Sequence, residues 1–275
     1  MSQTVHPPHS DRLHRTGAVL NPSPDRRDQV DWQAWVDSWD AQQAGYVVDR
    51  EARMAFMLDL LERLDAAPGA LLDLACGTGT ISERALRRFP AAEVFALDVD
   101  PFLMELGRRT LGQRVNWIDA DLREQGWGAD LADAHLDAAC SATALHWLAA
   151  PDVQRLADVL AAKLRPGGVF LNYDSMPLLP DEHPRLSTLA TKLRHEHAAE
   201  QQSRGAQDWQ SWWGLARSEP AFEQLLARRD EVFGQRSPGP PVPRDEMVRA
   251  LRERGFAEVD TLAQSADRHL LVAIR

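Results

Sequence analysis

Short apolar runs alternate with helical stretches in the middle of this chain, and that alternation limits its fold more than any other feature. Strand-length apolar runs, each followed by helical periodicity, are typical of a parallel sheet whose strands are joined by crossover helices. We expect strands at residues 70–75, 93–98, 115–118, 136–141 and 169–173, and helices between them at residues 80–89, 101–110 and 151–164. The sequence therefore predicts a Rossmann-like, doubly wound α/β fold.

The segments before and after these strands and helices have patterns of their own, which predict a tail, a lid, a cap and a hairpin. Residues 1–28 contain four prolines and no apolar periodicity, so we expect a disordered tail. Residues 29–66 carry two helical patterns and are expected to form a lid over the core, which spans residues 67–176. Residues 177–243 interrupt the alternation with a helical insertion, expected to cap the substrate. Residues 244–275 predict a helix and an antiparallel hairpin that completes a mostly parallel, seven-stranded sheet.

Composition places the chain among ordinary globular proteins and makes some partners unexpected. Of its 275 residues, 44% are hydrophobic and 26% are charged, and the formal net charge is −10. The basic residues are scattered, whereas a duplex-binding surface gathers them, so nucleic acid is not an expected partner. No apolar run approaches the ~20 residues that cross a bilayer, and residues 1–21 lack a signal-peptide pattern. We therefore expect a cytoplasmic protein without a membrane partner, whose Cys76 and Cys140 are free thiols.

A glycine loop follows the first predicted strand. It runs from Ala75 through Cys76, Gly77 and Thr78 to Gly79, and a helical pattern begins immediately afterwards. Small residues at this place let backbone amides approach a nucleoside-bearing cofactor closely. A plain strand-to-helix turn has a similar composition, so the loop needs support from other residues.

Two carboxylates near the loop supply that support. Asp98 ends the second predicted strand 21 residues after Gly77, where it can accept hydrogen bonds from both hydroxyls of a ribose. Asp73 lies inside the first strand, where a buried carboxylate is costly unless loop amides or an ammonium group donate to it. A dinucleotide-binding loop would carry a third glycine near Ser82, but this chain has no glycine there. A nicotinamide cofactor is therefore the weaker alternative.

At this point the residues carry a family resemblance. Residues 71–79 resemble the first motif of class I S-adenosylmethionine-dependent methyltransferases, although Ala75 stands where that family usually has glycine. Four later segments are similar to the remaining motifs of the family, in the same order: residues 96–101, 115–122, 137–147 and 164–168. The resemblance implies S-adenosylmethionine as the cofactor. It is nearest to the small-molecule subgroup that includes trans-aconitate methyltransferase.

The resemblance also implies a set of cofactor-binding residues. They are Tyr46, Arg53, Asp73, Ala75, Cys76, Gly77, Gly79, Asp98, Val99, Asp121, Leu122 and Ser141. Asp121 matches the acidic residue that meets the adenine amino group, with Asp119 as the alternative register. Tyr46 belongs to the helices that close over the cofactor in the subgroup, where Arg50 or Arg53 either pairs with the cofactor carboxylate or lies on a solvated face.

His146 is the candidate catalytic base, because it follows the fourth strand, where the cofactor methyl group should emerge, and imidazole titrates near neutral pH. The alternative is a histidine that only packs beside Trp147. Trp147, Trp209 and Trp213 are candidates for the walls of a substrate pocket, although tryptophans at helical spacing more often belong to a core. His195 and His197 point to different faces of a predicted helix, so no metal is implied.

Together these observations predict a bacterial enzyme that transfers a methyl group from S-adenosylmethionine to a small molecule. Oxygen of a carboxylate or hydroxyl is the expected acceptor, because the chain lacks the Asn/Asp-Pro-Pro-Tyr sequence that would resemble amide or amine methyltransferases. A nicotinamide-dependent oxidoreductase and a non-catalytic methyltransferase-like binding module are the alternatives. The sequence leaves the identity of the acceptor and the oligomeric state open.

Overall fold

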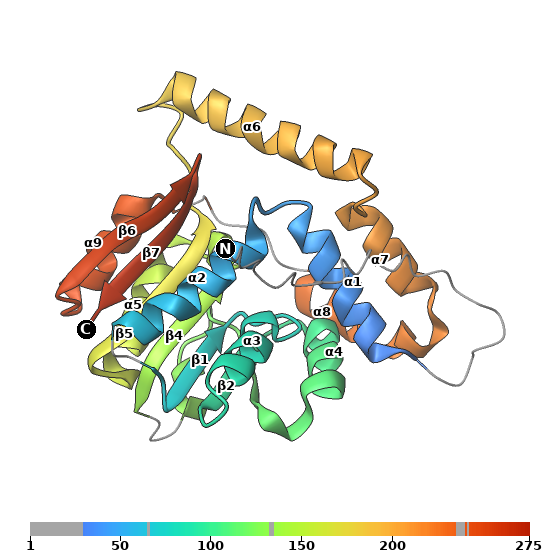
Figure 1. The fold of residues 1–275 in the computed structure, drawn as a ribbon, viewed down its shortest axis with the longest axis horizontal. Coiled ribbons are helices and arrows are strands. Elements are labelled where there is room, and N and C mark those ends of the chain that lie inside the picture. The colour runs from blue at the N-terminus through green and yellow to red at the C-terminus, as the bar shows by residue number, and fades with distance from the viewer. Residues whose placement is uncertain (1–29, 65–66, 132–134, 235–239, 241) are drawn as a thin grey trace, which may run out of the picture.

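A computed structural model describes residues 30–64, 67–131, 135–234, 240 and 242–275, so the expected tail lies outside the described residues. Its centre is one sheet with the strand order β3-β2-β1-β4-β5-β7-β6 (Figure 1). The strands are β1 (Ala70–Leu74), β2 (Glu93–Asp98), β3 (Asn116–Asp119), β4 (Leu136–Ala142), β5 (Leu164–Ser175), β6 (Glu258–Ser265) and β7 (Arg268–Ile274). The predicted fold class is confirmed.

The strand order reverses between β1 and β4. From β1 the chain moves outward through β2 and β3, then returns to place β4 on the other side of β1, all in parallel. β5 continues the parallel set, whereas β7 runs antiparallel to both β5 and β6. Open α/β sheets bind their ligands beyond the carboxyl ends of the strands beside such a reversal, so a ligand is expected at the ends of β1 and β4.

Helices cover both faces of the sheet, so its central strands are apolar on both sides. One face packs against α2 (Arg50–Arg63), α3 (Thr80–Arg88) and α4 (Pro101–Leu111). The other packs against α5 (Ala150–Lys163) and α9 (Arg244–Glu253). Four short 3₁₀ helices complete this part of the chain and the cap: η1 (Gly112–Arg114), η2 (Trp127–Leu131), η3 (Leu145–Trp147) and η4 (Pro220–Phe222).

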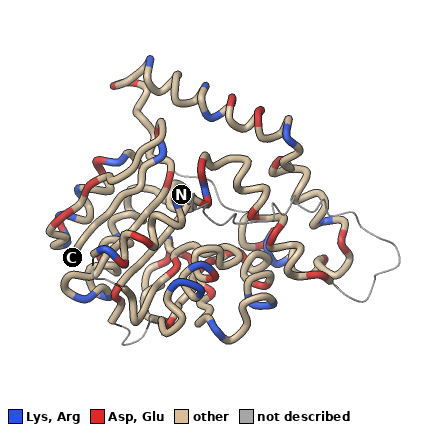
Figure 2. The backbone as a smooth tube through the Cα atoms, viewed as in Figure 1, with Lys and Arg blue, Asp and Glu red and all other residues tan. Residues whose placement is uncertain are grey.

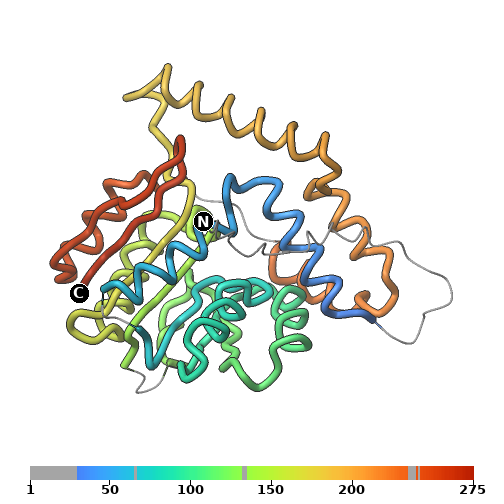
Figure 3. Tube along the Cα trace, viewed as in Figure 1, coloured from blue at the N-terminus to red at the C-terminus, as the bar shows by residue number. Residues whose placement is uncertain are grey.

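A third apolar cluster joins the predicted lid to the predicted cap. It brings together α1 (Trp32–Ala44), α7 (Trp209–Ser218), α8 (Glu223–Phe233) and one side of α4. Trp39 and Trp212 meet edge to face at 4.9 Å, as do Phe102 and Phe222. These segments are far apart in sequence but lie side by side (Figure 3). The lid and the cap therefore share one aromatic core outside the sheet.

Helix α6 (Pro184–Ser203) spans the space between the end of β5 and the start of α7, above the rest of the molecule (Figure 1). Ala190 is its one fully buried residue, whereas Leu186, Leu189 and Leu193 are exposed. None of the described helices is long and apolar enough to cross a membrane. Both signs of charge are interspersed along the described chain, as Figure 2 shows.

Two strands extend at least four residues beyond the bounds that the sequence predicts: β5, expected at residues 169–173, and β6, expected at residues 257–261. β5 begins at Leu164, which pairs with Leu136, and a register shift then accommodates the turn at residues 165–168. Gly167 takes a positive φ of 76° in this turn. β6 continues to Ser265 because a second register shift follows Thr261. Local apolar patterns are interrupted at both irregularities, so the sequence marked only the regular part of each strand.

The substitution Trp212→Phe should lower the free energy of unfolding by about 1–3 kcal/mol, because it leaves a cavity and removes a buried hydrogen bond. Trp212 is fully buried, and its indole nitrogen donates to Ser38 Oγ at 3.0 Å. Urea unfolding followed by circular dichroism measures the loss. Trp209→Phe is the matched control, since Trp209 is 43% exposed, and it should change stability by less than ~0.5 kcal/mol. Equal losses would contradict the assignment of Trp212 to the core.

Candidate active site

The glycine loop turns the chain sharply between β1 and α3. Ala75, Gly77 and Gly79 adopt positive φ angles of 52°, 56° and 80°. A side chain at Gly79 would come within 2.9 Å of Leu111, which leaves room only for glycine. At Gly77 the nearest described atom would be Leu103 Cδ1 at 3.8 Å, so this part of the loop is open to a ligand. Backbone can therefore approach a bound group closely here.

Asp98 holds the loop from the end of β2. Its Oδ2 accepts a hydrogen bond from the amide of Gly77 at 2.8 Å, and its Oδ1 accepts from the amides of Val99 and Asp100 at 2.6 and 2.8 Å. Burial and the neighbouring Asp100 raise the pKa of the Asp98 carboxyl to about 6, against the effect of the three amides. A carboxylate has about four acceptor positions, so some capacity remains for a ligand hydroxyl.

Asp73 is buried at the end of β1, with 1% of its surface exposed. Its Oδ2 accepts from the amide and the hydroxyl of Ser82, at 2.9 and 2.7 Å. Burial raises its pKa to about 7, although the bonds from Ser82 oppose the change. Oδ1 has no partner among the described residues. Leaving such an atom unsatisfied is costly, so Asp73 fits a ligand that brings a donor group.

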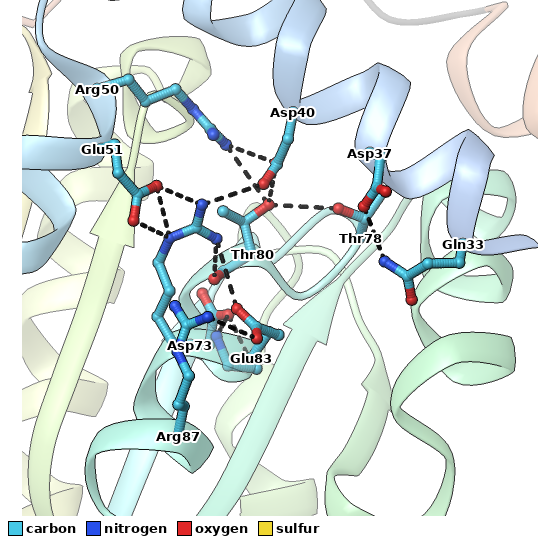
Figure 4. A network of polar contacts seen from close by, with 12 residues as sticks. Gln33, Asp37, Asp40, Arg50, Glu51, Asp73, Thr78, Thr80, Glu83 and Arg87 are labelled. Carbon is cyan, nitrogen blue, oxygen red and sulfur yellow. Dashed lines mark hydrogen bonds and ion pairs between the residues drawn. The ribbon is translucent and has the colours of Figure 1, made fainter. Parts of the chain in front are cut away.

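A partly buried ion-pair network fastens α1 and α2 to the start of α3 (Figure 4). Asp40 of α1 accepts hydrogen bonds from Arg50 at 3.1 Å and from Thr80 Oγ1 at 2.8 Å. Its other oxygen accepts from Arg84 at 3.2 Å, and Arg84 also binds Glu51 of α2. Burial raises the pKa of Asp40, but Arg50 and Arg84 more than offset it, so the pKa is lowered overall. Both lid helices are thus held beside the glycine loop.

His146 and Asp174 form a hydrogen-bonded pair at the carboxyl ends of β4 and β5. The Nδ1 atom of His146 lies 2.7 Å from Asp174 Oδ1, and the His146 amide donates to Oδ2 at 2.9 Å. Because a carboxylate only accepts, Nδ1 carries a proton in this arrangement, and in the neutral imidazole Nε2 is then the acceptor. Asp174 is 1% exposed and His146 is half-buried. The pair therefore presents a positioned proton acceptor.

The chain that carries His146 is strained. Thr143 follows β4 with a φ of 58°, a conformation that is uncommon for a β-branched residue and costs of order 1–3 kcal/mol. Its amide donates to the carbonyl of Tyr173 at 2.8 Å, and the next turn is anchored by the buried Leu145. The surrounding packing thus fixes a sharp turn directly before His146.

Residues 71–168 match a protein family described as a methyltransferase domain. The matched segment begins in β1, includes the glycine loop, Asp98 and His146, and ends at the turn inside β5. This part of the chain is a methyltransferase domain. The predicted resemblance to class I S-adenosylmethionine-dependent methyltransferases is confirmed.

Known proteins similar to the chain are also named as methyltransferases. Trans-aconitate 2-methyltransferase of Azoarcus sp. (strain BH72) is 34% identical over 143 residues, which are 50% of this chain and 53% of that relative. Ribosomal RNA small subunit methyltransferase C of Stutzerimonas stutzeri (strain A1501) is 42% identical over 88 residues, 32% of this chain and 26% of the relative. The chain thus spans about half or less of the length of these curated relatives.

A solved structure shares the fold beyond the methyltransferase domain. A protein of Nostoc punctiforme, provisionally described as an O-methyltransferase, superposes with a TM-score of 0.54 at 14% sequence identity. The superposition covers 88% of this chain and 60% of that one. At this identity the likeness extends to the fold alone.

Most of the predicted cofactor residues gather around the loop of the methyltransferase domain. Ala75, Cys76, Gly77, Gly79, Asp73, Asp98 and Val99 lie in or beside it. Leu122 is buried in the core after β3. Asp121 lies two residues beyond the end of β3 and pairs with Arg123 at 3.0 Å, while Asp119 pairs with Arg108 at 2.7 Å. These residues therefore lie at or near the carboxyl ends of β1, β2 and β3, and their role in cofactor binding stays a prediction.

Three of the predicted site residues have other partners. Ser141 is fully buried, and its hydroxyl donates to the carbonyl of Leu74 at 2.9 Å, so this side chain joins two strands instead of facing the crevice. The hydroxyl of Tyr46 accepts a hydrogen bond from the amide of Trp209 at 2.8 Å, so Tyr46 contacts the predicted cap. Arg53 lies beside Tyr173 of β5, whereas Arg50 reaches the glycine-loop side.

The structure contradicts two expectations, one for Arg50 and one for Trp213. Arg50 has 7% of its side chain exposed, so the alternative of a solvated helix face is wrong for it. Trp213 is 7% exposed and stacks against Arg229 at 3.8 Å. It therefore packs the aromatic core and does not line an open pocket. Trp147 and Trp209 are 59% and 43% exposed and stay candidates for contact with an acceptor.

The sequence did not single out Asp174 or Asp40. Asp174 is separated from His146 by 28 residues, and the two meet only through the pairing of β4 with β5. The available signal was an acidic residue at the end of an apolar strand, the same signal that marked Asp73 and Asp98. Asp40 carries no comparable signal, because polar residues are common on an amphipathic helix.

The substitution Ala75→Gly should raise the free energy of unfolding by about 0.5–1 kcal/mol, because alanine is strained at the φ of 52° that this turn requires. Ala52→Gly is the control, for which the change in the free energy of unfolding should have the opposite sign. Ala52 is exposed within α2, where glycine should cost about 1 kcal/mol. Urea unfolding of both variants measures the two effects. A loss of stability in Ala75→Gly would show that the positive φ is not a source of strain.

Proposed function

We propose that the chain is an S-adenosylmethionine-dependent methyltransferase that methylates a hydroxyl oxygen of a small molecule. The observation that carries this proposal is the pair formed by His146 and Asp174 beside the crevice. A carboxylate acceptor is already ionised at neutral pH and needs no base, whereas a hydroxyl must lose its proton. A positioned imidazole therefore favours the hydroxyl over the carboxylate as the reacting group.

The residues around the loop fit this cofactor. Asp98 has acceptor capacity left for a ribose hydroxyl, and Asp73 Oδ1 lacks a donor that an amino group could supply. The open side of Gly77 permits close approach of a nucleoside or amino acid moiety. When bound, the cofactor supplies a methyl group activated by its sulfonium. The buried ion pairs of Asp40 keep the lid helices over the same place and help exclude water.

The reaction then requires little from the protein beyond alignment and one proton transfer. Asp174 accepts the hydrogen bond from Nδ1 of His146 and so fixes the orientation of the ring. Nε2 would take the proton of the acceptor hydroxyl, whose oxygen would receive the methyl group that the bound cofactor would supply. Trp147 stacks on the His146 ring with centroids 4.9 Å apart, which further restricts its rotation.

The relatives support a small-molecule acceptor without identifying it. One is named for trans-aconitate and another, from Anoxybacillus flavithermus, for malonyl-[acyl-carrier protein], although a third is named for ribosomal RNA. The segment after β4 reads Ser141-Ala142-Thr143-Ala144, which lacks the motif expected for methylation of an amine. Residues 177–243, with α6 and α7, are the proposed cap over this acceptor.

Isothermal titration tests the cofactor assignment. S-adenosylmethionine and its demethylated product should both bind, and Asp98→Asn should weaken the product about 10- to 100-fold, because it loses charge-assisted hydrogen bonds. Asp98 with its pKa of about 6 is protonated at lower pH, so wild-type affinity should fall below pH 6, while Asp98→Asn should show a flatter profile. Binding of a nicotinamide cofactor in place of both ligands would instead support the oxidoreductase alternative.

Measurements of turnover test the proposed roles of His146 and Asp174. A mass-spectrometric screen of metabolite extracts for a single methyl gain supplies the acceptor, and His146→Ala should then lower kcat by about 10²–10⁴-fold. Asp174→Asn should lower kcat and change its pH profile, because the ring is no longer held in one tautomer. Neither variant should change affinity for the demethylated cofactor. His195→Ala, on the exposed side of α6, is the control without effect. Cofactor binding with no turnover on any extract would favour a non-catalytic binding module.

A further inference from the structure

Asp100 is a buried carboxylate between β2 and α4, next to the group that holds the glycine loop. It lies two residues after the end of β2 and immediately before α4, and 3% of its surface is exposed. Its Oδ1 accepts hydrogen bonds from the amides of Phe102 and Leu103 at 3.0 and 3.2 Å, and so caps the helix. Its own amide donates to Oδ1 of Asp98 at 2.8 Å. Asp100 therefore connects Asp98 to the first turn of α4.

The charged partner of Asp100 comes from the predicted cap. Nε of Arg229 on α8 donates to Oδ2 of Asp100 at 2.7 Å, across 129 positions of the sequence. The side chain of Arg229 is 15% exposed, and its guanidinium carbon lies 3.8 Å from the ring centroid of Trp213 and 4.5 Å from that of Phe233. Contacts of arginine with aromatic faces are attractive and restrict its orientation. The cap therefore holds this guanidinium against the turn that follows β2.

Arg229 balances part of the negative charge at this end of the sheet. Burial raises the pKa of Asp100, and the charge of Arg229 is the strongest of the effects that oppose the change. Burial and then Asp100 raise the pKa of Asp98, while burial and Asp98 raise that of Asp73. Within the described ranges, no other cation lies within 4.0 Å of these three carboxylates. Loss of Arg229 would leave a buried charge without a partner, beside Asp98.

Packing of α4 continues the path from the cap to the glycine loop. Phe102 and Leu103 belong to the aromatic core that α4 shares with α8 (Figure 1). The amide of Leu103 is one of the two that Asp100 caps, and its Cδ1 is the atom that a side chain at Gly77 would meet first, at 3.8 Å. Gly77 in turn donates its amide to Asp98 at 2.8 Å. The cap, the first turn of α4 and the loop are therefore joined by direct contacts.

We propose that Arg229 is a positioning residue for the cofactor site. Its bond to Asp100 keeps the turn after β2 in the conformation in which Asp98 accepts the loop amides and presents its remaining acceptor positions to a ribose. Groups that are already in place before binding lose less freedom when the ligand arrives, so affinity rises. Arg229 acts through Asp100 and Asp98, without contact to the cofactor. This inference rests on the proposed function of the site.

Isothermal titration with the demethylated cofactor tests the proposal. Arg229→Met keeps an unbranched, apolar side chain but removes the charge, and should weaken binding at least about tenfold. The double variant Arg229→Met with Asp100→Asn also removes the unpaired carboxylate, while asparagine can still cap α4, so affinity should return to within about threefold of wild type. Arg217→Met is the matched control, because Arg217 of α7 pairs with the exposed Asp230 in the same cap, and affinity should stay unchanged.

Hydrogen exchange followed by mass spectrometry supplies two further readouts. In the free protein, the amides of Val99, Asp100, Phe102 and Leu103 should exchange at least about tenfold faster in Arg229→Met than in wild type, because the turn is no longer held. Coupling between two sites acts in both directions, so saturation with the demethylated cofactor should slow exchange in residues 223–233 of wild type but not of Arg229→Met. A purely structural role of the arginine would not produce this second difference.

Two results would overturn the positioning role. One is a folded Arg229→Met variant whose affinity for the demethylated cofactor lies within twofold of wild type. The other is an equal loss of affinity in the single and double variants, which would assign the effect to packing of the arginine instead of charge on Asp100. If Arg229→Met does not fold, Arg229→Lys takes its place with an expected loss of about threefold, because lysine keeps the charge but not the planar contacts. Failure of wild type to bind the cofactor would instead contradict the proposed function, and exchange in the free protein would still decide whether Arg229 holds the turn.

Discussion

The reversal of strand order between β1 and β4 is the constraint on which the rest of the molecule depends. The parallel strands all point the same way, so their carboxyl ends lie together at one end of the sheet. At the reversal, the connections that follow β1 and β4 run away from each other. Asp73 and Asp98 approach this end of the sheet from β1 and β2, and His146 and Asp174 from β4 and β5. The two carboxylates near the glycine loop therefore lie on one side of the reversal, and the hydrogen-bonded pair of His146 and Asp174 lies on the other.

Charge burial holds the helical lid to this sheet. Asp40 is enclosed by two arginines and a threonine hydroxyl, and removal of any one partner would leave a charge with little access to water. The aromatic core between lid and cap attaches the same helix from its other side. Helix α1 is thus fixed by polar contacts toward the glycine loop and by apolar contacts toward the cap.

Local patterns were sufficient to predict the sheet and to place the glycine loop, Asp73 and Asp98 beside the ends of its strands. The glycine loop, Asp73 and Asp98 stand beside the strand ends that mark them, so sequence order and spatial order coincide there. Asp174 depends on strand pairing across a long sequence separation, which periodicity does not encode. The prediction that Trp213 of α7 lines a pocket was wrong for a related reason. Helical spacing shows that the tryptophans of α7 share a face, but only the partner helix decides whether that face is core or pocket.

Tyr46 has a consequence for the order in which the chain is assembled. Its hydroxyl contacts Trp209, 163 positions later, and its carbonyl contacts Arg268, 222 positions later. During synthesis from the amino terminus, the strands and loop of the cofactor side can emerge and pair well before either contact exists. The hairpin that supplies Arg268 is synthesised after all the other strands of the sheet. Both contacts of Tyr46 therefore form only after the strands around the glycine loop have been synthesised.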